Sequence, residues 1–239
     1  PMALYVTRYL GFDALPVAVI PSLLCTALML TQRKTIAIPR LEHNIKQAET
    51  SKTTASSYVS LFLVVAIVIM RSWTQMGLLS YIPFYYINHL KGDPLFAGNL
   101  IFVFLACGAA GTLIGAPFAD RWGHRFFIRL TMFLATLILP LMFVPFIAKS
   151  YLLFVVLGLE GLILISTFSV TVVMAQRLLP HRLGIASGLM VGFAIGTGGI
   201  GVTILGVIAD NFGVPVALEA IMVLPFIGFL LSLVVKYKE

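Results

Sequence analysis

Residues 115–125 read GAPFADRWGHR, and this short stretch decides the fold. Its charged residues surround Gly123 and separate two long apolar runs, the second of which continues as FFIRLTMFLATLILPLMFVPF. A tight turn between two helices needs a residue that tolerates a positive φ angle, and glycine is that residue. The stretch therefore predicts a polar turn between two helices that lie in an apolar environment.

The composition identifies that environment as a lipid bilayer. Of the 239 residues, 60% are hydrophobic and 10% are charged, against about 25% charged in soluble domains. A bilayer core of about 30 Å requires roughly 20 consecutive apolar residues in a helix. The sequence predicts an all-α, multi-pass membrane protein with spans near residues 13–31, 58–88, 95–118, 126–147, 151–176, 183–209 and 214–235.

The basic residues indicate membrane topology and not nucleic-acid binding. The sequence pI is about 9.6, but the Lys and Arg residues are spread along the chain and form no patch for nucleic acid. One side of the membrane would hold Arg33, Lys34, Arg40, Lys46, Lys52, Arg121, Arg125, Arg129, Arg177, Arg182, Lys236 and Lys238. The other side would hold only Arg8, Lys91 and Lys149. The positive-inside rule then places the 32–57 loop and the C-terminus in the cytoplasm.

The reactive residues do not group into a catalytic or metal-binding pattern. Cys25 and Cys107 both fall inside predicted spans, which supports neither a disulfide nor a cysteine metal site. The sequence offers no Ser-His-Asp set, no phosphate-binding loop and no spacing typical of metal ligands. We therefore expect no enzyme activity, no cofactor and no metal ion.

The long polar connection 32–57 divides the spans. Those after it can be divided into two triplets, 58–147 and 151–235. In each triplet the first span contains an internal ionisable residue, Arg71 or Glu160, and the second span is rich in glycine. Because successive triplets must insert in opposite directions, this pattern is typical of inverted-repeat transporters.

Residues 120–125, DRWGHR, resemble the motif A loop of the major facilitator superfamily, G-x-x-x-D-R/K-x-G-R-R/K. Residues 71–98, RSWTQMGLLSYIPFYYINHLKGDPLFAG, look in particular like the fosmidomycin-resistance subfamily of drug efflux transporters. The family has two six-helix halves, and the motif follows the second helix of each half. The resemblance implies the six-helix C-terminal half of a major facilitator plus one preceding transmembrane helix, in a bacterial cytoplasmic membrane.

The resemblance also implies that the chain is divided into three parts. Residues 1–31 would be the end of the N-terminal half, with the tail of helix 5 and helix 6. Residues 32–57 would be the cytoplasmic central linker, and residues 58–239 the domain of helices 7–12. The missing N-terminal half, helices 1–5, would be a partner. Residues 1–10 fit this assignment, because they are apolar but lack the basic region and cleavage site of a signal peptide.

The loop would act as a gate in this family, with its aspartate pairing with helix ends and its arginines with acidic partners. The positions that match the motif are Asp120, Arg121, Gly123 and Arg125. The chain departs from the motif where its first glycine falls on Ala116 and where His124 replaces an arginine. The alternative is that the loop arginines only fix topology by staying in the cytoplasm.

Arg71 and Glu160 are ionisable residues inside predicted spans. Inserting a charge there costs roughly 2.5–3.5 kcal/mol, so such residues pair with one another or mark a functional site. The helical rise places both at similar depth, and the resemblance places helices 7 and 10 beside the central cavity. We expect Arg71 to attract an anionic group and Glu160 to pair with Arg71 or to take a proton. A buried structural ion pair is the alternative.

Polar residues accompany both charges at helical spacing, so two polar stripes are predicted to line water or substrate. The stripe with Arg71 contains Thr74, Gln75 and Tyr85, and the stripe with Glu160 contains Thr167 and Thr171. The alternative for Tyr85 is an interfacial aromatic belt. The 58–88 span is too long for a straight crossing, and Pro83 with Gly77 predicts a kink.

A glycine ladder recurs every four residues in the 183–209 span, at Gly184, Gly188, Gly192 and Gly196. Small residues at this spacing let helix backbones approach closely in lipid. We expect the ladder to be a helix-packing surface.

These features favour a proton-coupled secondary transporter that exports a small drug-like or anionic compound. Its partners would be a small-molecule substrate, protons and the lipid bilayer. A seven-helix receptor is disfavoured, because the last span lacks a lysine for retinal and the longest loop follows the first span. A non-transporting membrane scaffold, or half of a split transporter that needs a partner, is the remaining alternative.

Overall fold

The computed structural model describes residues 23, 26–27, 30–31 and 55–235. The chain divides into two units, residues 1–52 and 53–239, and the fold described below belongs to the second. The predicted span 13–31 and the loop 32–57 lie almost entirely outside the described residues. Within the described part of the chain, every regular element is a helix.

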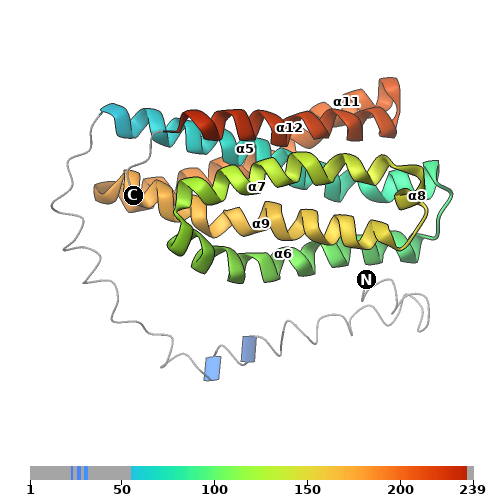
Figure 1. Cartoon of the computed structure of the whole chain (residues 1–239), viewed down its shortest axis with the longest axis horizontal. Helices are drawn as coiled ribbons and strands as arrows, with labels where there is room; N and C mark the ends of the chain where they lie inside the picture. Colours follow the sequence, from blue (N-terminus) through green and yellow to red (C-terminus); the bar gives the residue numbers. More distant parts are fainter. Residues whose placement is uncertain (1–22, 24–25, 28–29, 32–54, 236–239) are drawn as a thin grey trace. The chain divides into compact units, whose positions relative to one another are not determined.

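The described residues contain 6 helical spans that are long and apolar enough to cross a membrane (Figure 1). They run over Tyr58–His89, Pro94–Trp122, His124–Phe143, Leu152–Leu178, Pro180–Phe212 and Val214–Val234. The predicted spans that fall on described residues are therefore confirmed, with shifts of a few residues at their ends.

Some of these spans are built from more than one helix. The first is α5 (Ala55–Phe84) followed by the π-helix η2 (Tyr85–His89), and the second is α6 (Pro94–Trp122). The third is α7 (His124–Ile138) with the 3-10 helix η3 (Leu139–Phe143), followed by α8 (Pro145–Ala148). The fourth is α9 (Leu152–Leu178). The fifth contains η4 (Pro180–Arg182), α10 (Leu183–Ser187), the π-helix η5 (Gly188–Ala194) and α11 (Gly198–Phe212), and the sixth is α12 (Val214–Val234).

Helices α9 and α5 are the most enclosed. In their most apolar windows 61% and 50% of the residues are buried, against 22–39% in the other spans. Helix α9 packs against α6, while α5 packs against α12 and α11. The two central helices are also the helices that contain Glu160 and Arg71, so both ionisable residues lie in the interior of the bundle.

Local sequence signals set several helix boundaries, and the predicted turn at Gly123 is one of them. The side chain of Asp93 accepts a hydrogen bond from the Leu95 N–H at 3.2 Å, with Pro94 as the first helical residue, so α6 has a capped start. Gly123 has a φ of 93° between α6 and α7, as a tight turn requires. The turn between α11 and α12 is built in the same way on Gly213, with a φ of 91°.

Glycines bring α6 and α9 into backbone contact. A Cβ on Gly111 would overlap the carbonyl oxygen of Leu162, and a Cβ on Gly161 would overlap the carbonyl oxygen of Phe104. A Cβ on Gly115 would lie 2.8 Å from the carbonyl oxygen of Ser166. Close approach of this kind maximises van der Waals packing, which drives helix association in lipid.

The predicted glycine ladder does not pack in this way. A Cβ built on Gly184, Gly188, Gly192 or Gly196 would meet no atom within 4 Å. The four glycines face away from the described helices, and the close contacts of this span come from Gly198 and Gly201. A Cβ on Gly198 would lie 2.8 Å from Met76 Cγ. A Cβ on Gly201 would overlap the Trp73 ring. Spacing identifies a smooth helix face, but not whether another helix covers it.

The irregularity predicted in the first span lies beyond Pro83. Helix α5 continues through Gly77 and Pro83, and the π-helix η2 begins at Tyr85. Gly77 serves packing, since a Cβ there would lie 2.7 Å from Ile221 Cδ1 and 2.8 Å from Leu205 Cδ1. A proline removes one backbone donor from the helix, and a π-helical turn next to it is one way to accommodate that loss.

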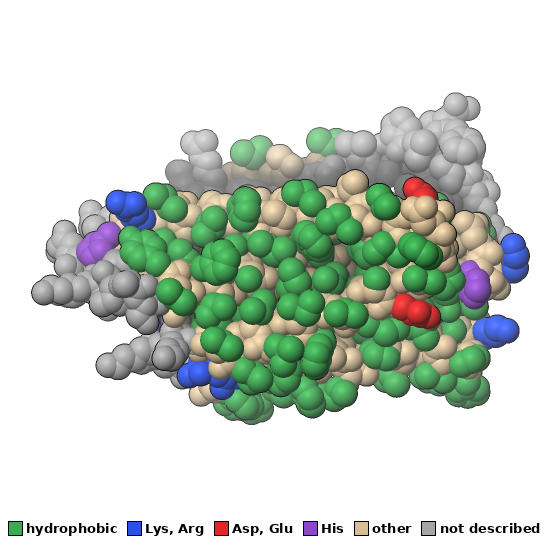
Figure 2. Space-filling view, turned by 90° about the horizontal axis from the view of Figure 1, so that it is seen from above, with side chains coloured by type: hydrophobic (Ala, Val, Ile, Leu, Met, Phe, Trp, Pro, Cys, Tyr) green, Lys and Arg blue, Asp and Glu red, His purple; other side chains and the backbone are tan. Residues whose placement is uncertain are grey.

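The outside of the helical unit is apolar. Leu113 is 78% exposed and Phe146 is 73% exposed. Figure 2 shows one face almost covered by hydrophobic side chains, with charged side chains toward its ends. Such a surface is suited to lipid and unsuited to water. Its helices and its surface make this an integral, multi-pass membrane protein.

Candidate functional site

Arg71 is buried near the middle of the first span. Its side chain is 2% exposed, and Nη1 donates a hydrogen bond of 3.0 Å to the side-chain oxygen of Gln75, one turn further along α5. Nε has no hydrogen-bond partner. Gln75 is neutral and half-buried, so the structure solvates this guanidinium only in part and supplies no counter-charge through that bond.

Glu160 lies on α9, which packs against α5. It is 0% exposed, and neither of its carboxylate oxygens has a hydrogen-bond partner. The predicted Arg71–Glu160 ion pair is therefore not formed in this structure. A buried group with unmet hydrogen-bonding capacity is rare and requires an explanation. Helices α5 and α9 thus place Arg71 and Glu160 in the interior of the same bundle, but the two side chains do not pair.

The threonines of the predicted polar stripes are satisfied within their own helices. Thr74 donates to the Met70 carbonyl at 2.8 Å, Thr167 to the Leu164 carbonyl at 2.7 Å, and Thr171 to the Thr167 carbonyl at 3.0 Å. All three are almost fully buried. The stripes therefore lie inside the helical bundle in this conformation, because back-bonding lets threonine hydroxyls face an apolar interior.

Tyr85 belongs to an aromatic group at the end of the first span. It is 6% exposed, stacks on His89 with ring centroids 5.3 Å apart, and lies 5.8 Å from the Phe143 ring. It starts the π-helix η2, so its direction is set by that helical turn and not by the regular spacing from Arg71. The neighbouring Tyr86 stacks on Phe96 at 4.7 Å and ties the same turn to α6.

The 120–125 loop joins α6 to α7 at Gly123. Asp120 and Arg121 are exposed. One oxygen of Asp120 lies 3.6 Å from Nε2 of His124, whose side chain is only 6% exposed. This contact spans the turn and uses the histidine that stands where the family motif has an arginine. Asp120 thus has a partner within the loop itself.

Arg125 and Arg129 bind the end of α12. Arg129 donates from Nε to the Ser232 carbonyl at 3.1 Å and from Nη2 to the Leu233 carbonyl at 2.8 Å. Arg125 reaches the Leu233 carbonyl at 3.5 Å. The last carbonyls of a helix lack intrahelical partners and carry partial negative charge. The positively charged arginines supply the hydrogen-bond donors that these carbonyls lack.

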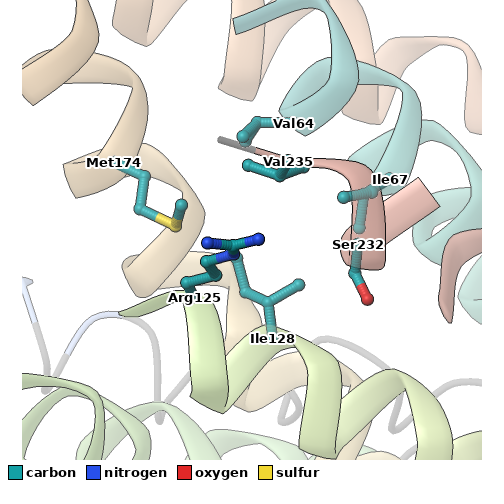
Figure 3. A pocket seen from close by; sticks show the side chains of 7 residues that line it. All are labelled: Val64, Ile67, Arg125, Ile128, Met174, Ser232 and Val235. Carbon is teal, nitrogen blue, oxygen red and sulfur yellow. The ribbon is translucent and has the colours of Figure 1, made fainter. Parts of the chain in front are cut away.

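Figure 3 shows the Arg125 guanidinium among the apolar side chains of Val64, Ile67, Ile128, Met174 and Val235, close to Ser232. The cavity that these residues line has a volume of about 10 Å³, room for a single water molecule. Such a cavity is too small for a substrate. In this conformation Arg125 is therefore part of a packed junction between α7 and α12.

Arg129 was not among the residues predicted for the loop. The signal that could have identified it is its spacing of four from Arg125, which places both guanidinium groups on one face of α7. Sequence spacing shows that the two side chains lie on the same face of the helix. It does not show that their target is a helix end, because that depends on where α12 stops.

The sequence model of the Major Facilitator Superfamily matches residues 61–239. The chain is 46% identical over 134 residues to "Uncharacterized MFS-type transporter YfnC" of Bacillus subtilis (strain 168). That match covers 56% of this chain and 32% of the relative. It is 35% identical over 175 residues to "Fosmidomycin resistance protein" of Escherichia coli (strain K12), covering 72% of this chain and 41% of the relative. The matched regions thus span about a third to two fifths of these relatives.

Proposed function

This chain belongs to the Major Facilitator Superfamily, and from that premise we propose that it is part of a secondary transporter that exports a small drug-like or anionic compound in exchange for protons. It is not an enzyme. The resistance named for the Escherichia coli relative supports efflux of a drug-like compound. The observation that carries the proposal is the pair of buried ionisable residues, Arg71 and Glu160, each incompletely satisfied at the centre of the helical unit.

Arg71 is the proposed anchor for an anionic group of the substrate. Its hydrogen-bond partner is the neutral amide of Gln75, and Nε remains available. An anion at this guanidinium would supply both the missing counter-charge and the missing acceptor, which makes a charge-assisted hydrogen bond. Because Arg71 is 2% exposed here, binding requires a conformation in which α5 is opened to the substrate.

Glu160 is the proposed proton carrier. A carboxylate buried without hydrogen bonds or a counter-charge is costly in an apolar interior. Binding a proton removes the charge, and pairing with Arg71 compensates it. The same residue can therefore respond to the proton gradient and to occupancy of Arg71, which is the coupling that exchange of substrate for protons requires. Gln75, Thr74, Thr167 and Tyr85 would form the surroundings of this site.

The 120–125 loop is the proposed gate, with Asp120, Arg121, Gly123 and Arg125 as its residues. Its contacts support a bistable junction, since Arg125 bonds to the α12 carbonyl of Leu233. Exchange of such a carbonyl contact for an acidic partner would favour one helix arrangement over another. We propose the bacterial cytoplasmic membrane as its location, with the 32–57 loop and the C-terminus in the cytoplasm.

The proposed domains are the end of an N-terminal half (1–31), a central linker (32–57) and helices 7–12 (58–239), with helices 1–5 as a partner. The part of the relatives that the matches leave uncovered supports such a partner. A half of a split transporter would therefore move substrate only after reassembly, whereas a scaffold would move none.

Flux measurements in proteoliposomes test this proposal. Substrate efflux and proton flux are measured for this chain alone and with an added N-terminal half, against a panel of drugs and organic anions. The expected result is flux from the reassembled protein, loss of flux in Arg71→Ala, and unchanged flux in Lys149→Ala, an exposed lysine in a loop. Reassembled protein that moves no compound on the panel would favour the scaffold. Flux that survives Arg71→Ala would remove Arg71 from the site.

A further inference from the structure

The span Pro180–Phe212 changes its helical form along its length. After the 3-10 helix η4 it runs as α10, becomes the π-helix η5 over Gly188–Ala194, passes a turn at Thr197 and continues as α11 from Gly198. π-helical turns are uncommon, cause kinks and occur often at functional sites. Irregular helices at membrane depth also occur where transporters move. The junction at residues 195–197 is therefore a natural hinge.

The part of this span beyond the junction is docked firmly on α5. Ser72 donates to the Ile195 carbonyl at 3.2 Å at the junction itself, and Tyr81 donates to the Val202 carbonyl at 2.9 Å beyond it. Between these bonds, Gly198 and Gly201 allow the close contacts with Met76 and Trp73 described above. Side-chain bonds to the backbone and tight glycine contacts fix α11 relative to α5.

The part before the junction makes fewer side-chain hydrogen bonds and fewer close glycine contacts with its neighbours. Its glycines Gly184, Gly188 and Gly192 face open space among the described residues, as does Gly196 in the junction. Within the described part of the chain, one side-chain hydrogen bond joins it to α9, in which Gln176 donates to the Ser187 hydroxyl at 2.8 Å. Its residues Ala186, Met190 and Ala194 are buried and pack it on the bundle, while Ile185 is 57% exposed and Phe193 is 55% exposed.

An apolar groove lies between this part and the first half of α5. Its volume is about 380 Å³. It is lined by Leu189 and Phe193 on one side and by Tyr58, Leu61, Phe62, Val65, Ala66 and Ile69 on the other. Movement of η5 toward α5 would fill this space with side chains and gain van der Waals contact, the main source of helix association in lipid.

We propose that residues 183–194 form a hinged segment that pivots at Ile195–Thr197 and closes onto the first half of α5, with the Gln176–Ser187 hydrogen bond holding it open in the state described here. The open groove supplies the space for the motion, and the docked α11 supplies the fixed support. The proposal concerns motion of the chain and not the compound transported, so it stands or falls independently of the proposed substrate.

Distances between spin labels in the full chain test the proposal, with Cys25 and Cys107 replaced by serine. Labels at Val59 and Ile185, which are 62% and 57% exposed, report on the groove. Labels at Phe84 and Val207, which are 54% and 60% exposed, report on the docked part. We expect two distance populations for the first pair and one for the second. A single population for the first pair, unchanged in every variant below, overturns the proposal.

Two kinds of variant test the Gln176–Ser187 hydrogen bond and the hinge at residues 195–197 separately. Ser187→Ala and Gln176→Ala remove the same hydrogen bond from opposite sides, and both are expected to at least double the fraction of the shorter distance. Gly196→Ala adds a methyl group that meets nothing and favours regular helix at the junction, so it is expected to halve that fraction. The matched control is Gly199→Ala, whose Cβ also meets nothing but which lies within α11. An equal effect of Gly199→Ala would contradict a hinge at residues 195–197.

Discussion

Gly161 of α9 lies so close to Phe104 of α6 that a Cβ on the glycine would overlap the phenylalanine carbonyl oxygen. The obstacle is backbone, which cannot rotate away as a side chain can. Gly111 makes the reciprocal contact with Leu162. The α6–α9 pair is therefore fixed by the absence of side chains at these positions, and this gives a sharp test of the fold.

Gly161→Ala is expected to destabilise the protein by about 1–3 kcal/mol, the usual cost of overpacking a core. The matched control is Gly192→Ala, because a Cβ at Gly192 meets nothing within 4 Å. Thermal unfolding in detergent, followed by helical circular dichroism, measures both. Equal midpoints for the two variants would show that α6 and α9 do not approach as closely as described.

Arg129→Ala is expected to loosen the end of α12. The variant loses two hydrogen bonds from a charged donor, to the Ser232 and Leu233 carbonyls. Because Arg129 is half-buried, we expect the free energy that stabilises the last turn of α12 to fall by about 1–2 kcal/mol. Hydrogen exchange of the last turn of α12 measures it, and protection in that turn would fall while protection in α9 stays the same. Arg121→Ala removes an exposed arginine from the neighbouring 120–125 loop and serves as the control.

Glu160→Gln is expected to leave stability unchanged or raised while it abolishes proton-linked flux. The carboxylate makes no hydrogen bond in this structure, so folding loses none when the charge is removed. Flux driven by a pH gradient, measured beside thermal unfolding, separates the two effects. The control is Glu219→Gln, which changes an exposed acid on α12. Normal flux in Glu160→Gln would transfer the proposed proton site to another residue.

Asp93→Ala removes the cap of α6 and is expected to destabilise the protein by about 1 kcal/mol. The side chain of Asp93 accepts from the Leu95 N–H, and alanine leaves that donor unsatisfied. Asn at this position retains an acceptor oxygen, so Asp93→Asn is expected to keep most of the stability. An Asp93→Asn variant as unstable as Asp93→Ala would assign the effect to charge and not to capping.

The helices of the described unit could be predicted from sequence because their causes are local. Apolar length sets a span, Asp93 with Pro94 starts a helix, and Gly123 permits a positive φ. Neighbour relationships could not be predicted in the same way. Helical rise gives the depth of Arg71 and Glu160 but not their lateral positions. Depth alone was therefore not enough to predict the ion pair, which is not formed in this structure.

The two glycine-rich spans show the same limit. Both carry glycine at a spacing of three or four residues, and the sequence suggests the same role for both. In the structure Gly111 and Gly115 contact α9, whereas Gly188 and Gly192 contact no described helix. A period of small residues marks a smooth face, and only the arrangement of the other helices decides whether that face is covered.

The two hydrogen bonds from Arg129 to the end of α12 also bear on which sequence positions define that helix end. A helix end usually depends on the residues that immediately follow it, such as a glycine that turns the chain back. Here the acceptors at Ser232 and Leu233 are completed by a side chain from α7. The requirement for a defined stop is thereby transferred from the end of α12 to a position about a hundred residues earlier. The last turn of α12 therefore depends on the residue type at position 129.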